Sequence, residues 1–249
     1  MKISIIIPTY NSEATLLDTL DSISGQSYGD IELIVIDGLS SDNTLSLING
    51  RSFRFPVKVI SEKDSGLYDA MNKGLSLAGG DIIHVLNSDD FYYSSEVLSK
   101  VVGFFSDQDV DAVYGDVSYV KRESVDREVR YWKSGHYSEK KLDYGWTIPH
   151  PALFIRAGLY KDLRFRTDLS LAADYEMILR LLKIKKARVF YLPELLVKMR
   201  EGGLSASSIS QRFLGWKELR LSWKINNLRV PYFFIARRIL GKIGQFKIF

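Results

Sequence analysis

Hydrophobic positions in the first hundred residues follow two alternating patterns. Short uninterrupted apolar runs, which are typical of buried strands, occupy Ile3–Pro8, Ile31–Asp37, Val57–Ser61 and Ile82–Leu86. Between these runs, apolar residues recur at helical spacing in segments that centre on Leu16–Ile23, Leu45–Ile48 and Tyr68–Leu77. Strands that alternate with helices in this way predict an α/β fold with a mainly parallel sheet and right-handed crossovers. We expect Asn11 or Ser12 to cap the first helix.

The pattern becomes mixed after the fourth apolar run. Val97–Phe105 is typical of a helix and Ala112–Val120 of a strand, whereas the polar stretch from Lys121 to Lys141 predicts a hairpin or a mobile insert. Leu171–Leu182 predicts a strong amphipathic helix, and Ala187–Leu192 predicts a last strand. The body of the chain is therefore expected to be one domain of mixed but mainly parallel sheet flanked by helices.

Charge divides the chain of 249 residues at about position 205. Residues 1–205 carry a net charge of −4, whereas residues 206–249 carry nine basic residues and one acid, Glu218, for a net charge of +8. We therefore predict two parts, a domain over 1–205 and a basic, amphipathic, helical extension over 206–249. The lack of cysteine excludes disulfides, thiolate zinc sites and cysteine nucleophiles, and no apolar run reaches the ~18 residues of a spanning helix.

Cations interleaved with aromatic and aliphatic residues make the extension resemble a helix that lies in the plane of a membrane surface. Each cation near an anionic leaflet contributes roughly 1 kcal/mol, so the extension could hold the protein peripherally. The alternative is that it packs on the body or on a second copy of the chain, as in a homodimer. Nucleic acid is not expected as a partner, because the body is acidic and no binding motif accompanies the extension.

Polar residues follow each of the four apolar runs, where a parallel sheet collects its ligands. These segments are Thr9-Tyr10-Asn11, Asp37-Gly38, Glu62-Lys63-Asp64 and Asn87-Ser88-Asp89-Asp90. The first turn lacks the G-x-G-x-x-G of dinucleotide-binding domains, and no G-x-x-x-x-G-K-[ST] loop is present. We expect one polar site along this edge of the sheet.

Asp89 and Asp90 adjoin the end of a buried strand, where two carboxylates repel each other unless a cation neutralises them. Oxygen ligands without cysteine favour Mg²⁺ or Mn²⁺ bound together with substrate phosphates. His150, beside Pro151, is a further candidate for a metal or phosphate contact. A turn followed by a helix cap is the structural alternative for the Asp-Asp pair.

Asp174 near the start of the second-half helix is the candidate general base, with Glu176 and Asp168 as rivals and helix capping as the structural alternative. The segment Asp64–Gly74 is dense in special residues, and Gly74 permits close approach to a neighbour or a ligand. Asn72 in this segment is a nucleotide-binding candidate, with a solvated helix face as the alternative.

Five motifs in a fixed order resemble family 2 glycosyltransferases of the GT-A fold, especially the bacterial branch that builds O-antigen and exopolysaccharide repeat units. They are I-I-I-P-T-Y-N, V-I-D-G, D-S-G-L-Y-D-A-M-N-K-G, L-N-S-D-D and A-A-D-Y-E. The resemblance covers residues 1–205 and implies transfer from a nucleotide diphosphate donor, usually a UDP-sugar, with inversion. It implies that the nucleotide is bound by Pro8, Thr9, Tyr10, Asp37 and Asp64.

The resemblance also implies that Asp89 and Asp90 hold the metal and that Asp174 is the catalytic base. Gly38, Asn87 and Ala173 stand where the family often has acids. Members of this branch act on polyprenyl-diphosphate or other saccharide acceptors at the cytoplasmic membrane face. Two alternatives remain, a sugar nucleotidyltransferase and a sugar-nucleotide-binding scaffold without turnover.

Overall fold

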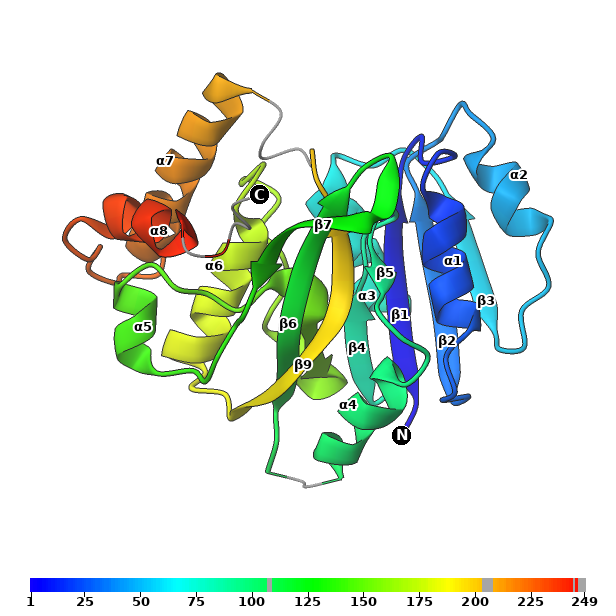
Figure 1. The fold of residues 1–249 in the computed structure, drawn as a ribbon, viewed down its shortest axis with the longest axis horizontal. Coiled ribbons are helices and arrows are strands. Elements are labelled where there is room, and N and C mark those ends of the chain that lie inside the picture. Colours follow the sequence, from blue (N-terminus) through cyan, green and yellow to red (C-terminus); the bar gives the residue numbers. More distant parts are fainter. Residues whose placement is uncertain (107–108, 203–207, 244, 246–249) are drawn as a thin grey trace.

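The computed structural model describes residues 1–106, 109–202, 208–243 and 245, and its centre is a nine-stranded sheet (Figure 1). The strands are β1 (Ile3–Thr9), β2 (Ile31–Asp37), β3 (Val57–Ser61), β4 (Ile82–Val85), β5 (Phe91–Tyr92), β6 (Ala112–Lys121), β7 (Ser124–Trp132), β8 (Leu153–Arg156) and β9 (Val189–Arg200). Their order is β3-β2-β1-β4-β8-β6-β9-β5, and β7 pairs with β6. The four apolar runs of the first hundred residues are the strands β1 to β4.

The sheet is mixed and has a parallel half. Strands β3, β2, β1 and β4 are parallel to one another, and β8 then runs antiparallel between β4 and β6. Strand β9 is parallel to β6, whereas β5 and β7 pair antiparallel with their neighbours. This arrangement confirms the expected mixed, mainly parallel α/β architecture.

Helices cover both faces of the sheet (Figure 1). They are α1 (Leu16–Ser24), α2 (Thr44–Asn49), α3 (Leu67–Leu77), α4 (Val97–Phe105), α5 (Glu139–Asp143), α6 (Ala173–Leu179), α7 (Ile209–Ile225) and α8 (Phe234–Ile243). Alternate residues of each strand point to opposite faces, so Ile6 packs with α3 and α6, whereas Ile5 packs with α1 and α4. The result is a three-layer α/β/α domain.

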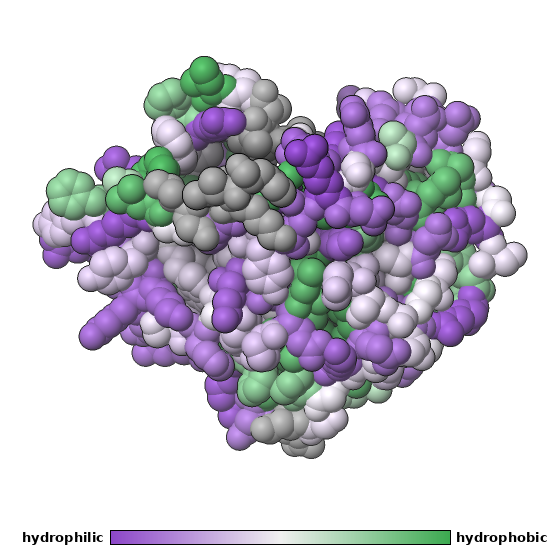
Figure 2. Space-filling view, viewed as in Figure 1, coloured by the Kyte–Doolittle hydropathy of each residue, from purple (hydrophilic) through white to green (hydrophobic). Residues whose placement is uncertain are grey.

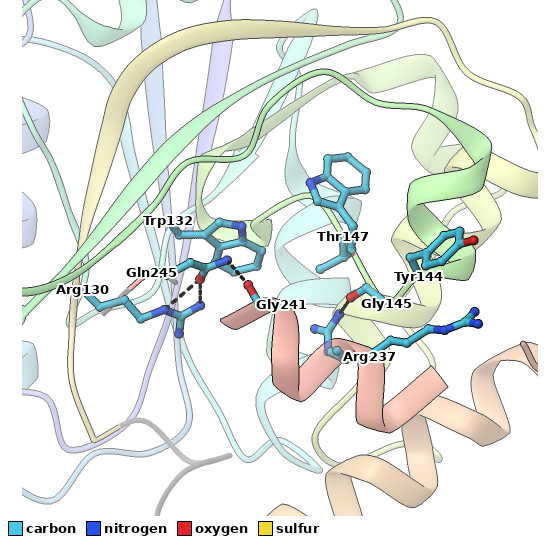
Figure 3. Close-up of a pocket in the computed structure, with 10 residues that line it drawn as sticks. Arg130, Trp132, Tyr144, Gly145, Thr147, Arg237, Gly241 and Gln245 are labelled. Atoms are coloured by element: carbon cyan, nitrogen blue, oxygen red, sulfur yellow. Dashed lines mark hydrogen bonds between the residues drawn. The ribbon is translucent and has the colours of Figure 1, made fainter. Parts of the chain in front are cut away.

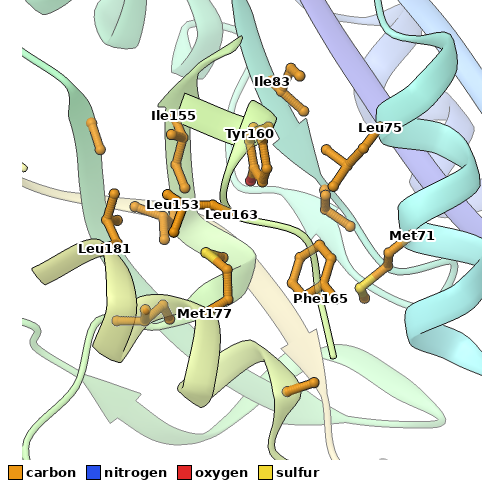
Figure 4. Packing of buried hydrophobic residues seen from close by; sticks show 14 of the residues in the cluster. Met71, Leu75, Ile83, Leu153, Ile155, Tyr160, Leu163, Phe165, Met177 and Leu181 are labelled. Carbon is orange, nitrogen blue, oxygen red and sulfur yellow. The ribbon is translucent and has the colours of Figure 1, made fainter. Parts of the chain in front are cut away.

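One buried cluster joins α3 and α6 across one face of the sheet (Figure 4). Met71 and Leu75 of α3 and Met177 of α6 belong to this cluster. A Cβ atom added to Gly74 would lie 2.3 Å from Ile6 Cγ2, so glycine lets α3 approach β1 this closely. Gly74 therefore serves packing in the described structure.

The polar stretch forms the hairpin that the sequence predicted as one of two alternatives, with strand β7 paired to β6, and α5 follows it. Three other details of the second half and of the first turn differ from the sequence prediction. Strand β9 continues past Pro193 to Arg200, because a register shift against β6 accommodates the proline. Helix α6 begins at Ala173 and passes into a π-helical turn at Arg180. Neither Asn11 nor Ser12 caps α1, since its cap position is Thr15 and Asn11 has a φ of 46°.

The basic extension contains two helices that pack on the body. Leu219 and Trp223 of α7, with Phe234 at the start of α8, form a buried cluster with Tyr175 and Leu179 of α6. The Trp223 indole also donates a hydrogen bond of 2.9 Å to the Tyr175 hydroxyl. The domain boundary predicted at residue 205 lies outside the described residues.

Candidate active site

The carboxyl ends of β1 and β2 place Thr9 and Asp37 side by side. The two residues are partners in the parallel register, and the Gly38 N–H donates to the Thr9 carbonyl at 2.9 Å. The buried Asp37 carboxylate accepts hydrogen bonds from the Ser40 backbone N–H at 3.0 Å and from the Ser61 hydroxyl at 2.7 Å. These bonds fix Asp37 rigidly at the strand edge.

Tyr10, Gly38 and Asp64 meet beside Asp37. A Cβ atom at Gly38 would lie 2.6 Å from Asp64 Oδ2 and 3.4 Å from Tyr10 Cδ2, so the glycine lets both side chains come close. The Asp64 carboxylate also accepts from the Gly66 N–H at 2.9 Å, while the Tyr10 side chain is 64 % exposed. The exposed Tyr10 ring can stack on a base, and the oriented Asp64 carboxylate can accept hydrogen bonds from a nucleoside.

Asp89 and Asp90 lie just beyond β4. Burial raises the pKa of Asp89, although the charge of Arg122 opposes this shift. Burial and then the charge of Asp89 raise the pKa of Asp90 well above its usual range. Two neighbouring carboxylates in such surroundings are stabilised by a cation.

Two arginines flank this pair. The Arg122 guanidinium lies 3.9 Å from Asp89 Oδ2, and the Arg200 guanidinium donates to the Asp89 carbonyl at 2.7 Å. Arg200 also pairs with Asp18 of α1, which ties the end of β9 to the loop after β4. Arg200 reaches the site because β9 is longer than its apolar pattern indicated.

The donor set around Asp89 and Asp90 fits a hard divalent cation. Asn87 Oδ1 is buried without a hydrogen-bond partner, while its Nδ2 donates to Asp90 Oδ2 at 3.0 Å. Carboxylate and amide oxygens are the ligands that Mg²⁺ and Mn²⁺ prefer. No group of three histidine or acidic residues forms a metal cage within the described residues, so substrate phosphates would complete the coordination.

Asp174 sits in the first turn of α6, and its Oδ1 accepts a hydrogen bond of 3.2 Å from the Tyr68 hydroxyl. Burial and then the charge of Asp174 raise the pKa of Tyr68, so its hydroxyl remains a donor. Within the described part of the chain, this is the one hydrogen bond that the Asp174 carboxylate accepts. Its second oxygen is therefore available to take a proton.

The two rival acids have other contacts. Glu176 is 1 % exposed, pairs with Arg180 at 2.8 Å and accepts from Asn226 at 2.8 Å. The Asp168 side chain is 61 % exposed and pairs with Arg166 at 2.6 Å. Geometry thus favours Asp174 over both as the candidate base.

Glu218 of the extension holds the start of the helix that carries Asp174. Its carboxylate accepts the backbone N–H groups of Ser170 at 2.9 Å, Leu171 at 2.8 Å and Ala172 at 3.0 Å. These donors precede α6, where an anion is favoured by the exposed N–H groups and the helix dipole. The extension is therefore part of the site's support.

Tyr119 of β6 connects the two acidic sites electrostatically. Burial raises the pKa of its hydroxyl, Asp90 and Asp174 raise it further, and Arg130 and Arg238 lower it. Tyr119 therefore lies within electrostatic reach of both the candidate metal site and the candidate base.

Two predicted residues have other surroundings than expected. The Asn72 amide donates to the Phe165 carbonyl at 2.8 Å and accepts from the Phe165 N–H at 2.9 Å, so both of its polar atoms hold the chain before α6. His150 is buried against the Phe165 ring at 5.6 Å, and burial lowers its pKa while Asp174 opposes the shift. His150 thus lies in the surroundings of Asp174, and it forms no three-residue metal group with Asp89 and Asp90 in the described chain.

Sequence reasoning missed Tyr68, Tyr119, Arg200 and Glu218. Tyr68 lies inside the dense 64–74 motif, which was the available signal, and Glu218 is the one acid of the basic extension. The residues around Tyr119 and Arg200 form no sequence motif that would have indicated them. Both reach the site only because β6 and β9 pair in the sheet.

Known proteins resemble this chain in sequence and in fold. The family model "Glycosyl transferase family 2" matches residues 4–164, which ends before Asp174. A "PGL/p-HBAD biosynthesis glycosyltransferase" of Mycobacterium tuberculosis is 33 % identical over 231 residues, covering 89 % of this chain and 85 % of the relative. Chondroitin synthase of Escherichia coli is 29 % identical over 187 residues, covering 73 % of this chain and 26 % of that protein.

Solved structures share the fold at low sequence identity. S. aureus TarS 1–349 in complex with UDP-GlcNAc has a TM-score of 0.71 and 20 % identity, covering 96 % of this chain and 73 % of that one. The chain spans only 44 % of a longer TarS structure. The mannosyltransferase PcManGT of Pyrobaculum calidifontis, in complex with GDP-Man and Mn²⁺, has a TM-score of 0.67 and 20 % identity, covering 97 % of this chain and 69 % of that one. These likenesses show a GT-A glycosyltransferase fold.

Proposed function

Because the chain belongs to glycosyl transferase family 2, we propose that this glycosyltransferase moves a sugar from a UDP-sugar to an acceptor hydroxyl with inversion at the anomeric carbon. The UDP and UDP-GlcNAc complexes of TarS support a uridine nucleotide as donor. Pro8, Thr9 and Tyr10 at the end of β1 would form one wall of the uracil pocket. Asp37 and Asp64 would contact the nucleoside.

Asp89 and Asp90 would hold Mn²⁺ or Mg²⁺ with the donor diphosphate, and the PcManGT complex with Mn²⁺ supports a divalent ion. Such an ion, when bound, offsets the negative charge that develops on the leaving diphosphate. The buried, unpartnered Asn87 Oδ1 would add a third oxygen donor to the same region. Arg122 lies 3.9 Å from the Asp89 carboxylate and limits the repulsion between the two acids.

Asp174 would accept the proton of the attacking hydroxyl, and its position carries the proposal. Tyr68 donates to Oδ1 and leaves Oδ2 without a partner among the described residues, so the carboxylate is oriented and forms no ion pair within them. A single inverting displacement requires one base and no covalent intermediate. Tyr68 fixes the carboxylate, and Glu218 fixes the start of its helix.

Asp174→Asn tests this assignment, with Asp168→Asn as the matched control on an exposed acid six residues away. We expect D174N to lower transfer at least a thousandfold and to keep the affinity for UDP within threefold, while D168N stays near the wild-type rate. UDP release and equilibrium UDP binding, both with Mn²⁺, provide the two measurements. A large loss of UDP affinity in D174N would instead make Asp174 a binding group.

The metal assignment has its own test. Asp89→Ala combined with Asp90→Ala should abolish the increase in UDP affinity that Mn²⁺ produces, since the remaining Asn87 oxygen cannot hold the ion alone. An unchanged Mn²⁺-dependent affinity in the double variant would refute this site. UDP release from a panel of UDP-hexoses, with and without chelator, also separates the enzyme from a binding scaffold, which would bind nucleotide without turnover.

The extension supports a peripheral location at the inner face of the cytoplasmic membrane, with a polyprenyl-diphosphate-linked or other saccharide acceptor. Both helices pack on the body, yet large apolar side chains stay exposed on α7, directly before α8 and on α8. Among them are Phe213, Phe233 and Leu240. Figure 2 shows hydrophobic side chains on the surface formed by α7 and α8. No helix in the described ranges is long and apolar enough to span a bilayer.

Membrane docking is tested with point variants, since deleting 206–249 would also remove Glu218. Phe213→Ser combined with Phe233→Ser removes two side chains that are 62 % and 78 % exposed. We expect sedimentation with vesicles containing phosphatidylglycerol to fall at least tenfold at constant fold stability. Phe190→Ser, at a 40 % exposed site on β9, is the control, and equal loss in both proteins would refute docking by the extension.

A further inference from the structure

A cavity of 120 Å³ lies between the hairpin strand β7, the segment after α5 and helix α8 (Figure 3). Polar groups of its walls bind one another. Arg238 donates to the Gly145 carbonyl at 2.8 Å, and Arg130 donates to Gln245 Oε1 at 2.9 Å. These bonds connect α8 and Gln245 to the body. The polar groups between α1 and the candidate metal ligands differ, because they all bind one four-residue segment.

This segment is the Asn87–Asp90 turn, which carries the candidate metal ligands. Each of its four backbone carbonyls accepts a hydrogen bond. The first carbonyl accepts from the Asp90 N–H at 3.1 Å, which closes the turn. The other three are bound by two threonines of α1 and by Arg200 of β9. The backbone of the turn is therefore fixed by groups that are not metal ligands themselves.

The two threonines of α1 hold the second and fourth carbonyls. The Thr19 hydroxyl donates to the Asp90 carbonyl at 2.7 Å and lies 3.1 Å from the Ser88 carbonyl. The Thr15 hydroxyl also donates to the Ser88 carbonyl at 3.1 Å. Thr19 is 0 % exposed, so removing its hydroxyl leaves a buried carbonyl without this donor, which costs free energy unless the turn moves.

Arg200 holds the third carbonyl, and an acid of α1 holds Arg200. The guanidinium donates to the Asp89 carbonyl at 2.7 Å and pairs with the Asp18 carboxylate. The Arg200 side chain is 3 % exposed, whereas that of Asp18 is 52 % exposed. Helix α1 therefore acts on the turn directly through its threonines and indirectly through this ion pair.

Neighbouring carboxylates repel each other, so an unrestrained turn would relax by moving Asp89 and Asp90 apart. A backbone that is held at every carbonyl resists this movement and keeps the pair ready for a cation. Groups that orient metal ligands from outside the ligand set typically change metal affinity 10–100-fold. We propose that Thr19 and Arg200 are positioning residues that hold these two acids in the geometry for a divalent cation, which rests on the metal site proposed above.

Thr19→Val tests the proposal, since it keeps the shape of the side chain and removes the hydroxyl. The readout is the Mn²⁺ midpoint, which is the Mn²⁺ concentration that gives half of the increase in UDP affinity. We expect this midpoint to rise about 10–100-fold, while the UDP affinity in chelator stays within about twofold of the wild type. Thr19→Ser keeps the hydroxyl and should restore the Mn²⁺ midpoint. Calorimetric titration of the full chain with UDP at a series of Mn²⁺ concentrations measures it without turnover.

Ser4→Ala is the matched control for the loss of a buried hydroxyl. Ser4 is also 0 % exposed, donates to Glu32 at 2.6 Å and accepts from the Gly80 N–H at 2.9 Å, near the start of β1. It should lower the urea midpoint of unfolding and leave the Mn²⁺ midpoint unchanged. Asp18→Asn changes a half-exposed side chain that does not contact the turn, so it tests the hold on Arg200 even if T19V is unstable. It should raise the Mn²⁺ midpoint at least threefold.

Three outcomes decide the proposal. A raised Mn²⁺ midpoint in T19V and D18N that T19S restores supports positioning. A wild-type Mn²⁺ midpoint in both T19V and D18N overturns it. An equal rise in S4A also overturns it, because a general loss of stability would then explain the shift. Failure of the metal site itself would appear separately, as an unchanged Mn²⁺ response in the Asp89 and Asp90 double variant, and failure of the proposed function as no UDP release from any UDP-sugar.

Discussion

Replacing Glu218 by glutamine should weaken both the fold and catalysis, because one carboxylate holds three backbone N–H groups ahead of α6. The glutamine oxygen can retain the two bonds from Leu171 and Ala172, but its NH₂ group then faces the Ser170 N–H. A hydrogen bond to a charged group is worth about 1.5–3 kcal/mol and one to a neutral group about 1 kcal/mol. Losing one bond and weakening two therefore costs at least about 2.5 kcal/mol, the sum at the lower end of these values.

We expect urea unfolding to report this loss as a lower midpoint at an unchanged slope. The start of α6 should also shift in this variant. Since a shift on the order of 1 Å at the base costs roughly 100-fold in rate, we expect a smaller shift to lower kcat at least tenfold. The KM for the UDP-sugar should stay constant. Leu219→Ala is the matched control, since it lies in the same α6–α7 contact and also destabilises but touches no N–H group. If E218Q kept its kcat, or if L219A lowered kcat equally, Glu218 would not position Asp174.

The remaining predictions concern packing, pH and the orientation of the base. Gly74→Ala should lower the free energy of unfolding by about 2 kcal/mol in urea, because the added methyl group meets Ile6. Gly103→Ala in α4, with open space around it, should raise the free energy of unfolding by about 0.5–1 kcal/mol. An unchanged free energy of unfolding in G74A would contradict this packing. Burial lowers the pKa of His84 to about 3, whereas the pKa in the unfolded chain is 6.5. Between pH 3 and pH 6.5 the unfolded state therefore binds more protons than the folded state, so the free energy of unfolding falls as the pH drops below 6.5. His84 contributes about 2 kcal/mol to the loss of stability from pH 7.5 to pH 5, and His84→Gln should remove this contribution while that of the buried His150 remains. An unchanged loss in the variant, measured by urea unfolding, would assign it to other groups. Tyr68→Phe should lower kcat about tenfold with UDP binding unchanged, and a wild-type kcat would show that its hydrogen bond to Asp174 has no catalytic role.

Much of the sheet was predictable because buried parallel strands are continuous apolar runs. Strands β2 and β3 begin and end where the pattern predicted. Strand β8 was missed because its four residues, Leu153–Arg156, lie between a proline turn and a glycine-containing turn and carry too little periodicity. The end of β9 was missed because Pro193 hides a strand that a register shift allows to continue.

The candidate site was predictable where its residues follow strands and unpredictable where it depends on distant pairing. Asp37, Asp64, Asp89 and Asp90 were found by their positions after apolar runs. Asp174 could not be separated from Glu176 by spacing alone, and the distinction came from the Arg180 and Asn226 contacts of Glu176. The charge pattern of the extension left membrane docking and packing on the body open, and the folded chain shows packing against α6.

The hydrogen bonds from the α6 start to Glu218 link catalytic competence to the order of protein synthesis. The ribosome makes Asp174 and all nine strands before it makes Glu218. In the proposed mechanism, a nascent chain that ends before Glu218 has its donor-binding strands but lacks the carboxylate that holds the start of α6. We therefore expect such a truncated chain to carry out sugar transfer at least tenfold more slowly than the chain that contains Glu218.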